Sequence, residues 1–314
     1  MSRVARAPGH GVGVICCMLA AIAWGTTGTV ASFAPGVSAV AIGAAAMGLG
    51  GLMQAMVAWR GIHRDRGALL RHRWLLIVGA VSVALYPLAF YSSMRLAGVT
   101  IGTVISIGSA PLISALIENR LEGSRLTFRW GIGALIGLAG MVLLSLAETD
   151  HGAVAPNIPL GVGLGLVAGG TYALYSWTAR RVMQRGVPAP AAMGATFGLG
   201  GLILLPILVA TGAPFLESAR NFGVGAYMAV VPMFLGYIAF GQGLARISSS
   251  LATTITLLEP VVAALLAVLF VGERLPPSGW TGVAMIVGCL FWITIPVPPR
   301  RDAPRPAASV VDPA

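Results

Sequence analysis

One carboxylate stands out by its position. Glu259 lies beside Pro260 in the apolar run TITLLEPVVAALL at 254–266. The nearest charged residues are Arg246 and Glu273, so Glu259 falls near the middle of a stretch long enough to cross a bilayer. A carboxylate at that depth costs roughly 2.5–3.5 kcal/mol on insertion scales. Such a group predicts either a site for a proton, a cation or an amine, or a structural hydrogen bond that fixes helix packing.

The neighbouring proline predicts a bend in the helix that carries this carboxylate. Pro260 lacks an amide donor and clashes with the carbonyl group four residues earlier, which is that of Thr256. The Thr256 side chain also lies on the same helical face as Glu259. Pro111 would have the same effect in the span 99–117. Paired bends at mid-depth are typical of gating helices in transporters, although prolines can also simply shape a static bundle.

Aromatic side chains give a second indication of a binding site. Tryptophan and tyrosine usually gather at the two membrane–water interfaces, whereas six of them fall inside apolar stretches of this chain. They are Trp24, Tyr86, Tyr91, Tyr172, Tyr175 and Tyr237. Together with Glu259 and Thr256 they predict an aromatic substrate site that suits amino acids, amines or aromatic metabolites. Packing between helices is the alternative role for any of these rings.

These residues need a scaffold, and the composition predicts that it spans a membrane. Of the 314 residues, 57% are hydrophobic and 10% are charged, and the mean hydropathy is +0.87. A soluble domain usually carries about 25% charged residues. The apolar stretches do not alternate as barrel strands would, so we expect an all-α polytopic membrane protein. Ten transmembrane helices are expected at 11–33, 37–59, 74–96, 99–117, 130–147, 158–178, 190–210, 222–244, 249–270 and 279–296.

The arginines predict how these spans are oriented. The chain has no lysine, and its net charge of +10 comes from 20 arginines. With both termini in the cytoplasm, all arginines except Arg95, Arg220 and Arg274 fall on the cytoplasmic side, as the positive-inside rule requires. We therefore interpret the basic charge as topology and not as nucleic-acid binding. An Arg-, Ala- and Gly-rich chain without lysine is typical of a GC-rich bacterial genome, so we expect a bacterial cytoplasmic (inner) membrane.

The chain also contains an internal duplication. The motif GLGGL occurs at 48–52 and again at 198–202, and a similar offset places Trp24 over Tyr172. A unit of five spans is odd, so its second copy enters the membrane the other way up. Matching connections carry many arginines in the first copy and few in the second, which agrees with inversion. We expect two inverted five-helix repeats, an architecture linked to alternating access around a midplane site.

Three stretches resemble a known family. They are AAIAWG at 20–25, GGTYALYS at 169–176 and LLEPVVAALLAVLFVGERL at 257–275. With the duplication, they make the chain similar to EamA-type members of the drug/metabolite transporter superfamily. The resemblance implies a membrane exporter of metabolites but does not specify the substrate. One departure is that the first copy has Ser124 where the second has Glu273.

The duplication and the resemblance together define the expected organisation. We expect a first EamA-like repeat at 1–147, an extracytoplasmic linker at 148–157, a second EamA-like repeat at 158–296 and a disordered cytoplasmic tail at 297–314. The first 23 residues could also be interpreted as a signal peptide. The repeat gives that segment a counterpart inside the chain, which favours a membrane span.

The sequence disfavours ATP-driven transport, a metal site and enzymatic catalysis. The chain has no GxxxxGK[ST] phosphate-binding loop and no lysine, so a transmembrane gradient is the expected energy source. The histidines at 10, 63, 72 and 151 lie outside the expected spans and form no metal-ligand pattern with the cysteines, so no metal and no cofactor are expected. A membrane-embedded enzyme would need a catalytic cluster and is disfavoured.

We therefore predict a secondary active, alternating-access exporter of small metabolites. Proton coupling through Glu259 is a separate hypothesis, and a passive facilitator of the same fold is the alternative. The expected partners are a small-molecule substrate, protons if coupling exists, and the lipid bilayer. A glycine stripe at 161, 165 and 169 permits close helix packing. It could also mark a dimer face, so monomer and homodimer both stay open.

Overall fold

The computed structural model describes residues 9–34, 36–124, 127–147, 157–271 and 274–294. The expected tail at 297–314 lies outside the described residues, as does the expected linker at 148–157 apart from Asn157. The side chain of Asn157 accepts a hydrogen bond from the Leu160 amide and so caps the helix that follows.

Ten spans are confirmed, because ten segments of the described chain are helical, long enough and apolar enough to cross a membrane. The described part of the chain contains no strand. The helices of the first repeat are α1 (His10–Gly25), α2 (Thr27–Ala31), α3 (Ala39–Val57), α4 (Trp59–Arg64), α5 (Arg66–Arg71), α6 (Arg73–Ala97), α7 (Val99–Glu122) and α8 (Phe128–Ala147). Those of the second are α9 (Ile158–Gln184), α10 (Ala189–Thr211), η1 (Ala213–Leu216), α11 (Ala219–Met228), η2 (Ala229–Leu235), α12 (Gly236–Leu244), α13 (Ser249–Ile255), α14 (Leu258–Leu266), η3 (Ala267–Val271) and α15 (Pro277–Thr294).

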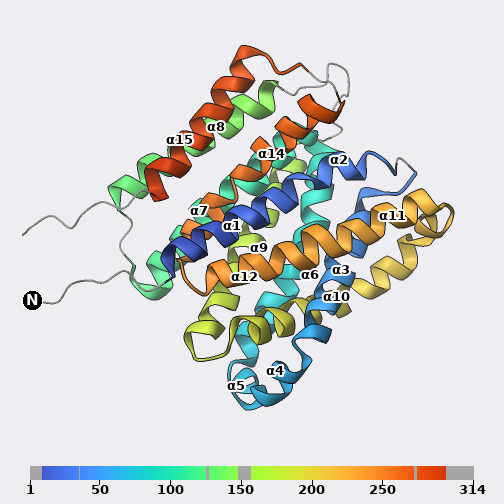
Figure 1. Ribbon diagram of the computed structural model, residues 1–314, viewed down its shortest axis with the longest axis vertical. Coiled ribbons are helices and arrows are strands. Elements are labelled where there is room, and N and C mark those ends of the chain that lie inside the picture. The colour runs from blue at the N-terminus through green and yellow to red at the C-terminus, as the bar shows by residue number, and fades with distance from the viewer. Residues whose placement is uncertain (1–8, 35, 125–126, 148–156, 272–273, 295–314) are drawn as a thin grey trace, which may run out of the picture.

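The two repeats exchange their first helices. Helix α1 packs on α12 and α14 of the second repeat, whereas α9 packs on α6 and α7 of the first. Helix α13, which precedes α14 in the same span, lies between these groups and packs chiefly on α7. We call these groups the α1 bundle and the α9 bundle. They form the middle of the molecule in Figure 1, with the pair α8 and α15 above them and the pair α3 and α10 below. Because each bundle contains helices from both repeats, neither repeat forms a separate unit.

Glycines permit the close packing inside the α9 bundle. A Cβ atom at Gly161 would lie 2.5 Å from the Cβ of Ala97 on α6, and one at Gly169 would lie 2.0 Å from the Oγ of Ser109 on α7. Side chains larger than hydrogen would therefore push α9 away from both neighbours. Close helix packing accounts for the glycine stripe noted in the sequence.

The helix ends define two faces of the molecule. One face carries α4 and α5, which lie at the lower end of both ribbon views, together with the ends of α7 and α9 and the connection between α12 and α13. Most of the described arginines are at this end, so we call it the arginine-rich face. Helices α7 and α9 extend to Glu122 and Gln184, several residues beyond the expected ends of their spans. Long charged side chains can reach water from such positions, so hydropathy alone underestimates the length of these helices.

Candidate functional site

The ninth span is broken directly before the mid-membrane carboxylate. Helix α13 ends at Ile255 and α14 begins at Leu258. The carbonyl oxygen of Thr256 cannot bond to Pro260, which has no N–H, and instead accepts from the amide of Glu259 at 3.0 Å. At the expected bend the α-helical hydrogen bonds are thus interrupted over Thr256 and Leu257, whose backbone dihedrals stay in the right-handed helical region. In the first repeat, by contrast, α7 continues as one α-helix through Pro111.

The break places Glu259 in the first turn of α14. A negative charge is favoured there because the amide dipoles of a helix point their positive end toward its N-terminus. Glu259 is partly exposed, and no described residue hydrogen-bonds to its carboxylate or pairs with it. It lies within electrostatic range of Tyr86, Tyr91, Tyr172 and Tyr237. The carboxylate can therefore accept a ligand cation in an environment of hydroxyl groups.

Two glycines make room for Trp24 and for the close approach of α1 to α14. A Cβ atom at Gly25 would lie 2.8 Å from the carbonyl oxygen of Glu259, so the glycine lets α1 approach the first turn of α14. The buried indole donates from Nε1 to the carbonyl oxygen of Pro232 at 2.9 Å. Pro232 lies in η2, a π-helical turn in which the usual helical hydrogen bonds are disturbed. A Cβ at Gly236 would lie 2.9 Å from Nε1, so this glycine also makes room for the indole.

Two hydroxyl contacts join the α1 bundle to the α9 bundle. The hydroxyl of Tyr172 is 2.8 Å from Thr256 Oγ1, at the break in span nine, and the hydroxyl of Tyr175 is 2.7 Å from that of Tyr237. Trp24 meets Tyr172 edge-on, with ring centroids 6.2 Å apart. These two rings are at matching positions in the repeats. These contacts therefore lie where the repeats meet, which is where the inverted duplication predicts a substrate site.

The two remaining predicted rings continue the cluster along α6. The centroid of Tyr86 is 5.6 Å from that of Tyr172, and Tyr86 stacks on Phe90 at 5.7 Å. Tyr91 contacts Phe90 at 5.2 Å and packs against α3, where a Cβ at Gly43 would lie 2.6 Å from its ring. Tyr91 thus lies at the edge of the cluster. The structure brings the other predicted aromatic residues together in one group.

The sequence analysis missed the phenylalanines of this cluster. Phe240 is 5.2 Å from Trp24 and Phe197 is 4.4 Å from Tyr237, measured between ring centroids, and both are fully buried. Phenylalanine has no polar atom that makes it unusual inside a membrane span, so position in the span gave no signal. Only the spacing of Phe240, three residues after Tyr237 on the same helical face, could have indicated it.

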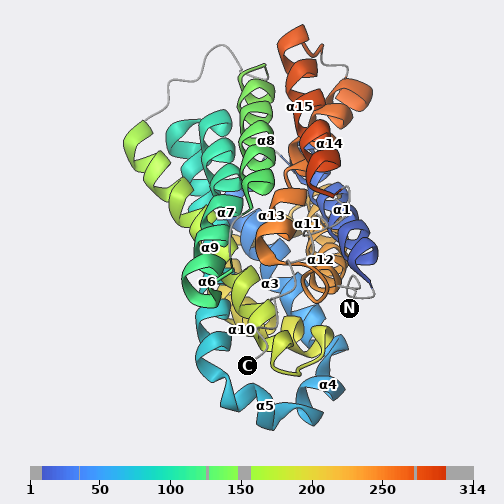
Figure 2. The ribbon, with the colours of Figure 1, turned by 90° about the vertical axis from the view of Figure 1, so that its left-hand side faces the viewer.

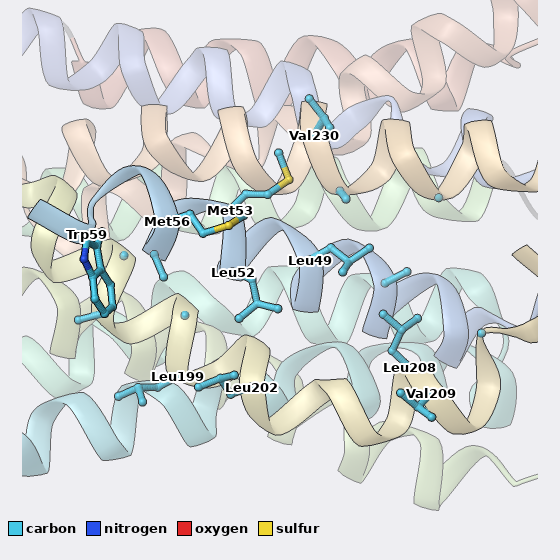
Figure 3. A pocket seen from close by; sticks show the side chains of 18 of the residues that line it. Leu49, Leu52, Met53, Met56, Trp59, Leu199, Leu202, Leu208, Val209 and Val230 are labelled. Atoms are coloured by element: carbon cyan, nitrogen blue, oxygen red, sulfur yellow. The ribbon is translucent and has the colours of Figure 1, made fainter.

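A wide groove of about 1240 Å³ lies elsewhere, between α3, α10 and the α11–η2 segment. Figure 3 shows its apolar lining, with Leu49, Met56 and Trp59 on one side and Leu202 and Val209 on the other. Met56 and Val209 are 66% and 82% exposed, as expected for side chains that face lipid. The groove is lined almost entirely by apolar residues, so it is a poor candidate for the binding site of a polar metabolite.

Comparison with known proteins identifies the family. The family model described as "EamA-like transporter family" matches residues 11–146 and 159–295. The chain belongs to the EamA-like transporter family. The resemblance seen in the sequence is thereby confirmed, and the protein is a membrane transporter with a small-molecule substrate. The relatives are bacterial, which, with ten apolar helices, supports a multi-pass inner-membrane protein.

Three relatives illustrate the range of this EamA-like group. The chain is 32% identical to "Uncharacterized transporter YwfM" of Bacillus subtilis, over 93% of this chain and 96% of that protein. It is 24% identical to the "Probable terminal-alkyne amino-acid exporter" of Streptantibioticus cattleyicolor, over 90% and 97%. It is 27% identical to the "Threonine/homoserine exporter RhtA" of Escherichia coli, over 66% of each chain.

A solved structure has the same fold. It superimposes with a TM-score of 0.76 at 20% identity and covers 90% of this chain and 96% of its own.

The described residues contain no cluster of three or more His, Cys, Asp or Glu side chains that could hold a metal ion.

Proposed function

We propose that this EamA-like transporter is a secondary active exporter of small metabolites that works by alternating access. The observation that carries the proposal is the position of Glu259, a carboxylate without a protein partner in the described chain, at the start of a broken helix. A membrane protein retains such a group at a cost, which binding of a cationic ligand group would offset. Its place where the two bundles meet suits a site that can open to either side.

The substrate class follows from the groups around this carboxylate. Glu259 would bind an ammonium group, and Trp24 and Tyr172 would offer aromatic faces to the same cation or to a flat side chain. Thr256, Tyr86, Tyr91, Tyr175 and Tyr237 would complete the site with hydroxyl groups and apolar surface. Amino acids, amines and aromatic metabolites fit this chemistry. Two relatives are named as exporters of amino acids, which favours the first of these classes.

The proposed orientation places the arginine-rich face and both termini in the cytoplasm, because basic residues are retained on that side. The proposed repeats are 1–147 and 158–296. In this orientation substrate enters from the arginine-rich face and leaves at the opposite one. The proposed outward direction rests on the names of the two relatives.

Proton coupling would use the same carboxylate. Glu259 would release the substrate ammonium to the outside and take up a proton there. It would lose that proton to the cytoplasm before it binds the next substrate molecule. Each cycle would then move one cationic group outward and one proton inward. A passive facilitator is the second candidate, because every contact in the site would also serve uncoupled transport.

The test is a comparative profile of the metabolites released by cells that express the wild type or Glu259→Gln at matched membrane levels. Glu217→Gln is the control, because Glu217 is exposed in the connection between α10 and α11. We expect a compound that the wild type and the control release and the Glu259 variant does not. Equal release by all three would remove Glu259 from the mechanism, and no release by any would contradict export.

A second measurement separates coupled from passive transport. Purified protein in vesicles is supplied with the compound identified above, with and without an imposed pH gradient. We expect the gradient to drive accumulation against the concentration of the compound. Equal rates and no accumulation would leave a facilitator.

A further inference from the structure

A second buried carboxylate lies outside the substrate site. Glu118, near the end of α7, is 3% exposed. Its Oε1 accepts a hydrogen bond from the amide of Ser249 at 2.6 Å, and its Oε2 accepts one from the hydroxyl of Ser250. Both donors lie in the first turn of α13, where amide groups lack a partner within the helix. The contact joins α7, in the α9 bundle, to α13, which leads into α14 of the α1 bundle.

A second contact made by a charged side chain holds the chain directly before α13. The guanidinium of Arg180, on α9, donates from Nε to the carbonyl oxygen of Ile247 at 2.7 Å, just before α13. Glu122 lies 3.9 Å from Arg180 and 3.8 Å from Arg181, and it accepts from the Trp177 indole at 2.9 Å. The end of α9 is thereby tied to the end of α7. The two bundles are therefore bonded together at the arginine-rich face.

The two halves of span nine differ in how they contact span four. Its first half, α13, packs extensively on α7, whereas its second half, α14, makes its extensive contacts with α1 and none of comparable extent with α7. The repeat offset that places Pro111 over Pro260 places Glu118 over Ala267. Alanine cannot form these bonds, so the opposite face lacks a matching contact at that position. Among the described residues, a hydrogen-bonded contact of this kind between spans four and nine is thus found at the arginine-rich face and not at the matching position of the opposite face.

We propose that Glu118 is the latch of the gate at the arginine-rich face. Its bonds to Ser249 and Ser250 hold the two bundles together there, and they must break before the substrate site can open toward that side. A cavity of about 300 Å³, lined by Glu118, Ser250 and Trp130 among others, reaches the latch from this face. The inference rests on the proposed alternating-access function, but its test measures opening of the gate and not export.

A reporter thiol behind the latch can detect that opening. Ser114 lies one helical turn before Glu118 on the same face of α7, is fully buried, and its hydroxyl has no hydrogen-bond partner in the described chain. Ser114→Cys therefore loses no hydrogen bond. It is introduced after Cys16, Cys17 and Cys289 have been replaced by alanine. The measured quantity is the rate at which a membrane-impermeant maleimide labels the purified full-length protein in lipid nanodiscs.

Three variants of this reporter protein test the latch. Glu118→Gln removes the charge, Ser250→Ala removes one of the two bonds, and Asp65→Asn is the control, because Asp65 pairs only with its neighbour Arg64 among the ion pairs of the described chain. A charge-assisted bond shifts an equilibrium by about tenfold or more. We expect labelling to be about tenfold faster in Glu118→Gln, a smaller increase in Ser250→Ala, and no change in Asp65→Asn.

Labelling of the Glu118 variant at the rate of its parent would overturn the proposal. If Glu118→Gln does not yield folded protein, Ser250→Ala decides instead, since it keeps the carboxylate, and an unchanged rate there is equally contrary. An increase in all three variants would indicate general loosening and would also contradict a specific latch. Faster labelling combined with no export by the wild type would support the latch and reject the proposed direction of transport.

Discussion

At the scale of single residues, contacts made by small and polar groups decide how the aromatic site is built. Glu259, Trp24 and Thr256 come from segments that pack closely only because Gly25 and Gly236 have no side chain. Composition and position in a span were enough to select these polar and aromatic residues. Their exact partners were not predictable, because a hydrogen bond such as that from Trp24 to the carbonyl oxygen of Pro232 depends on the packing of two helices distant in sequence.

Gly236→Ala tests the position of the indole. The added methyl group would lie 2.9 Å from Trp24 Nε1, so the ring must move away from Pro232. We expect the free energy of unfolding to fall by about 1–3 kcal/mol, the usual cost of overpacking, and export to fall with it. Thermal unfolding in detergent and export assays measure the two effects. Gly223→Ala is the control, because nothing lies within 4 Å of the added atom, and it should leave both unchanged.

Tyr172→Phe tests the hydroxyl contact between the bundles. It removes the bond to Thr256 Oγ1 and lowers the free energy of unfolding by about 1 kcal/mol. We expect weaker transport at low substrate concentration, because the hydroxyl belongs to the proposed site. Tyr227→Phe is the matched control, since it removes a 2.9 Å contact to Thr26 away from that site. If both variants transport equally, the Tyr172 hydroxyl has only a packing role.

At the scale of elements, the broken ninth span determines where the carboxylate lies. Proline spacing predicted a disturbance at Thr256, but not that α13 would end at Ile255 while α7 continues through Pro111. A proline removes one hydrogen bond in either helix. Whether the helix then bends or breaks depends on neighbouring contacts, such as those of Tyr172 and Gly25, which local sequence does not contain.

Pro260→Ala tests the break directly. Alanine restores the amide that can bond to the Thr256 carbonyl oxygen, so α13 and α14 can join into one helix and Glu259 leaves the first turn. We expect export to fall strongly without a loss of thermal stability. Pro206→Ala, in the interior of α10, is the control and should keep export. Full export by Pro260→Ala would mean that the break is not required.

A histidine contact at the arginine-rich face gives the expected pH dependence of stability. The His72 Nδ1 atom is 2.8 Å from a guanidinium nitrogen of Arg185. Burial, followed by the charges of Arg185 and Arg71, lowers the pKa of His72 below its usual value. The contact needs the neutral ring. Its contribution to stability is therefore present above the unfolded pKa of about 6.5 and is lost as the pH falls through the lower folded pKa.

The measurement is the unfolding temperature of the wild type and of His72→Gln across this pH range. We expect the wild type to be more stable above about pH 6.5 and the difference to shrink as the pH falls. A difference that grows on acidification would show that the charged ring is the stabilising form.

At the scale of the whole molecule, hydropathy and internal repetition predicted the ten spans and the two inverted repeats, both of which are confirmed. They did not predict that α1 and α9 exchange places between the repeats. All faces of such helices are apolar, so periodicity does not say which helix covers which. The exchange would matter for the proposed alternating access, because it makes each bundle a mixture of both repeats and places the proposed latch, Glu118, at their contact.

The central claim is that Glu259 binds the cationic group of the transported compound. Its most direct test is the affinity of purified wild type, Glu259→Gln and Glu217→Gln for the compound found by metabolite profiling, measured by calorimetry. Loss of a charge-assisted contact weakens binding by roughly tenfold or more, so we predict that loss for Glu259→Gln and unchanged affinity for Glu217→Gln. Equal affinity in all three proteins would contradict the claim and leave Glu259 as a packing residue.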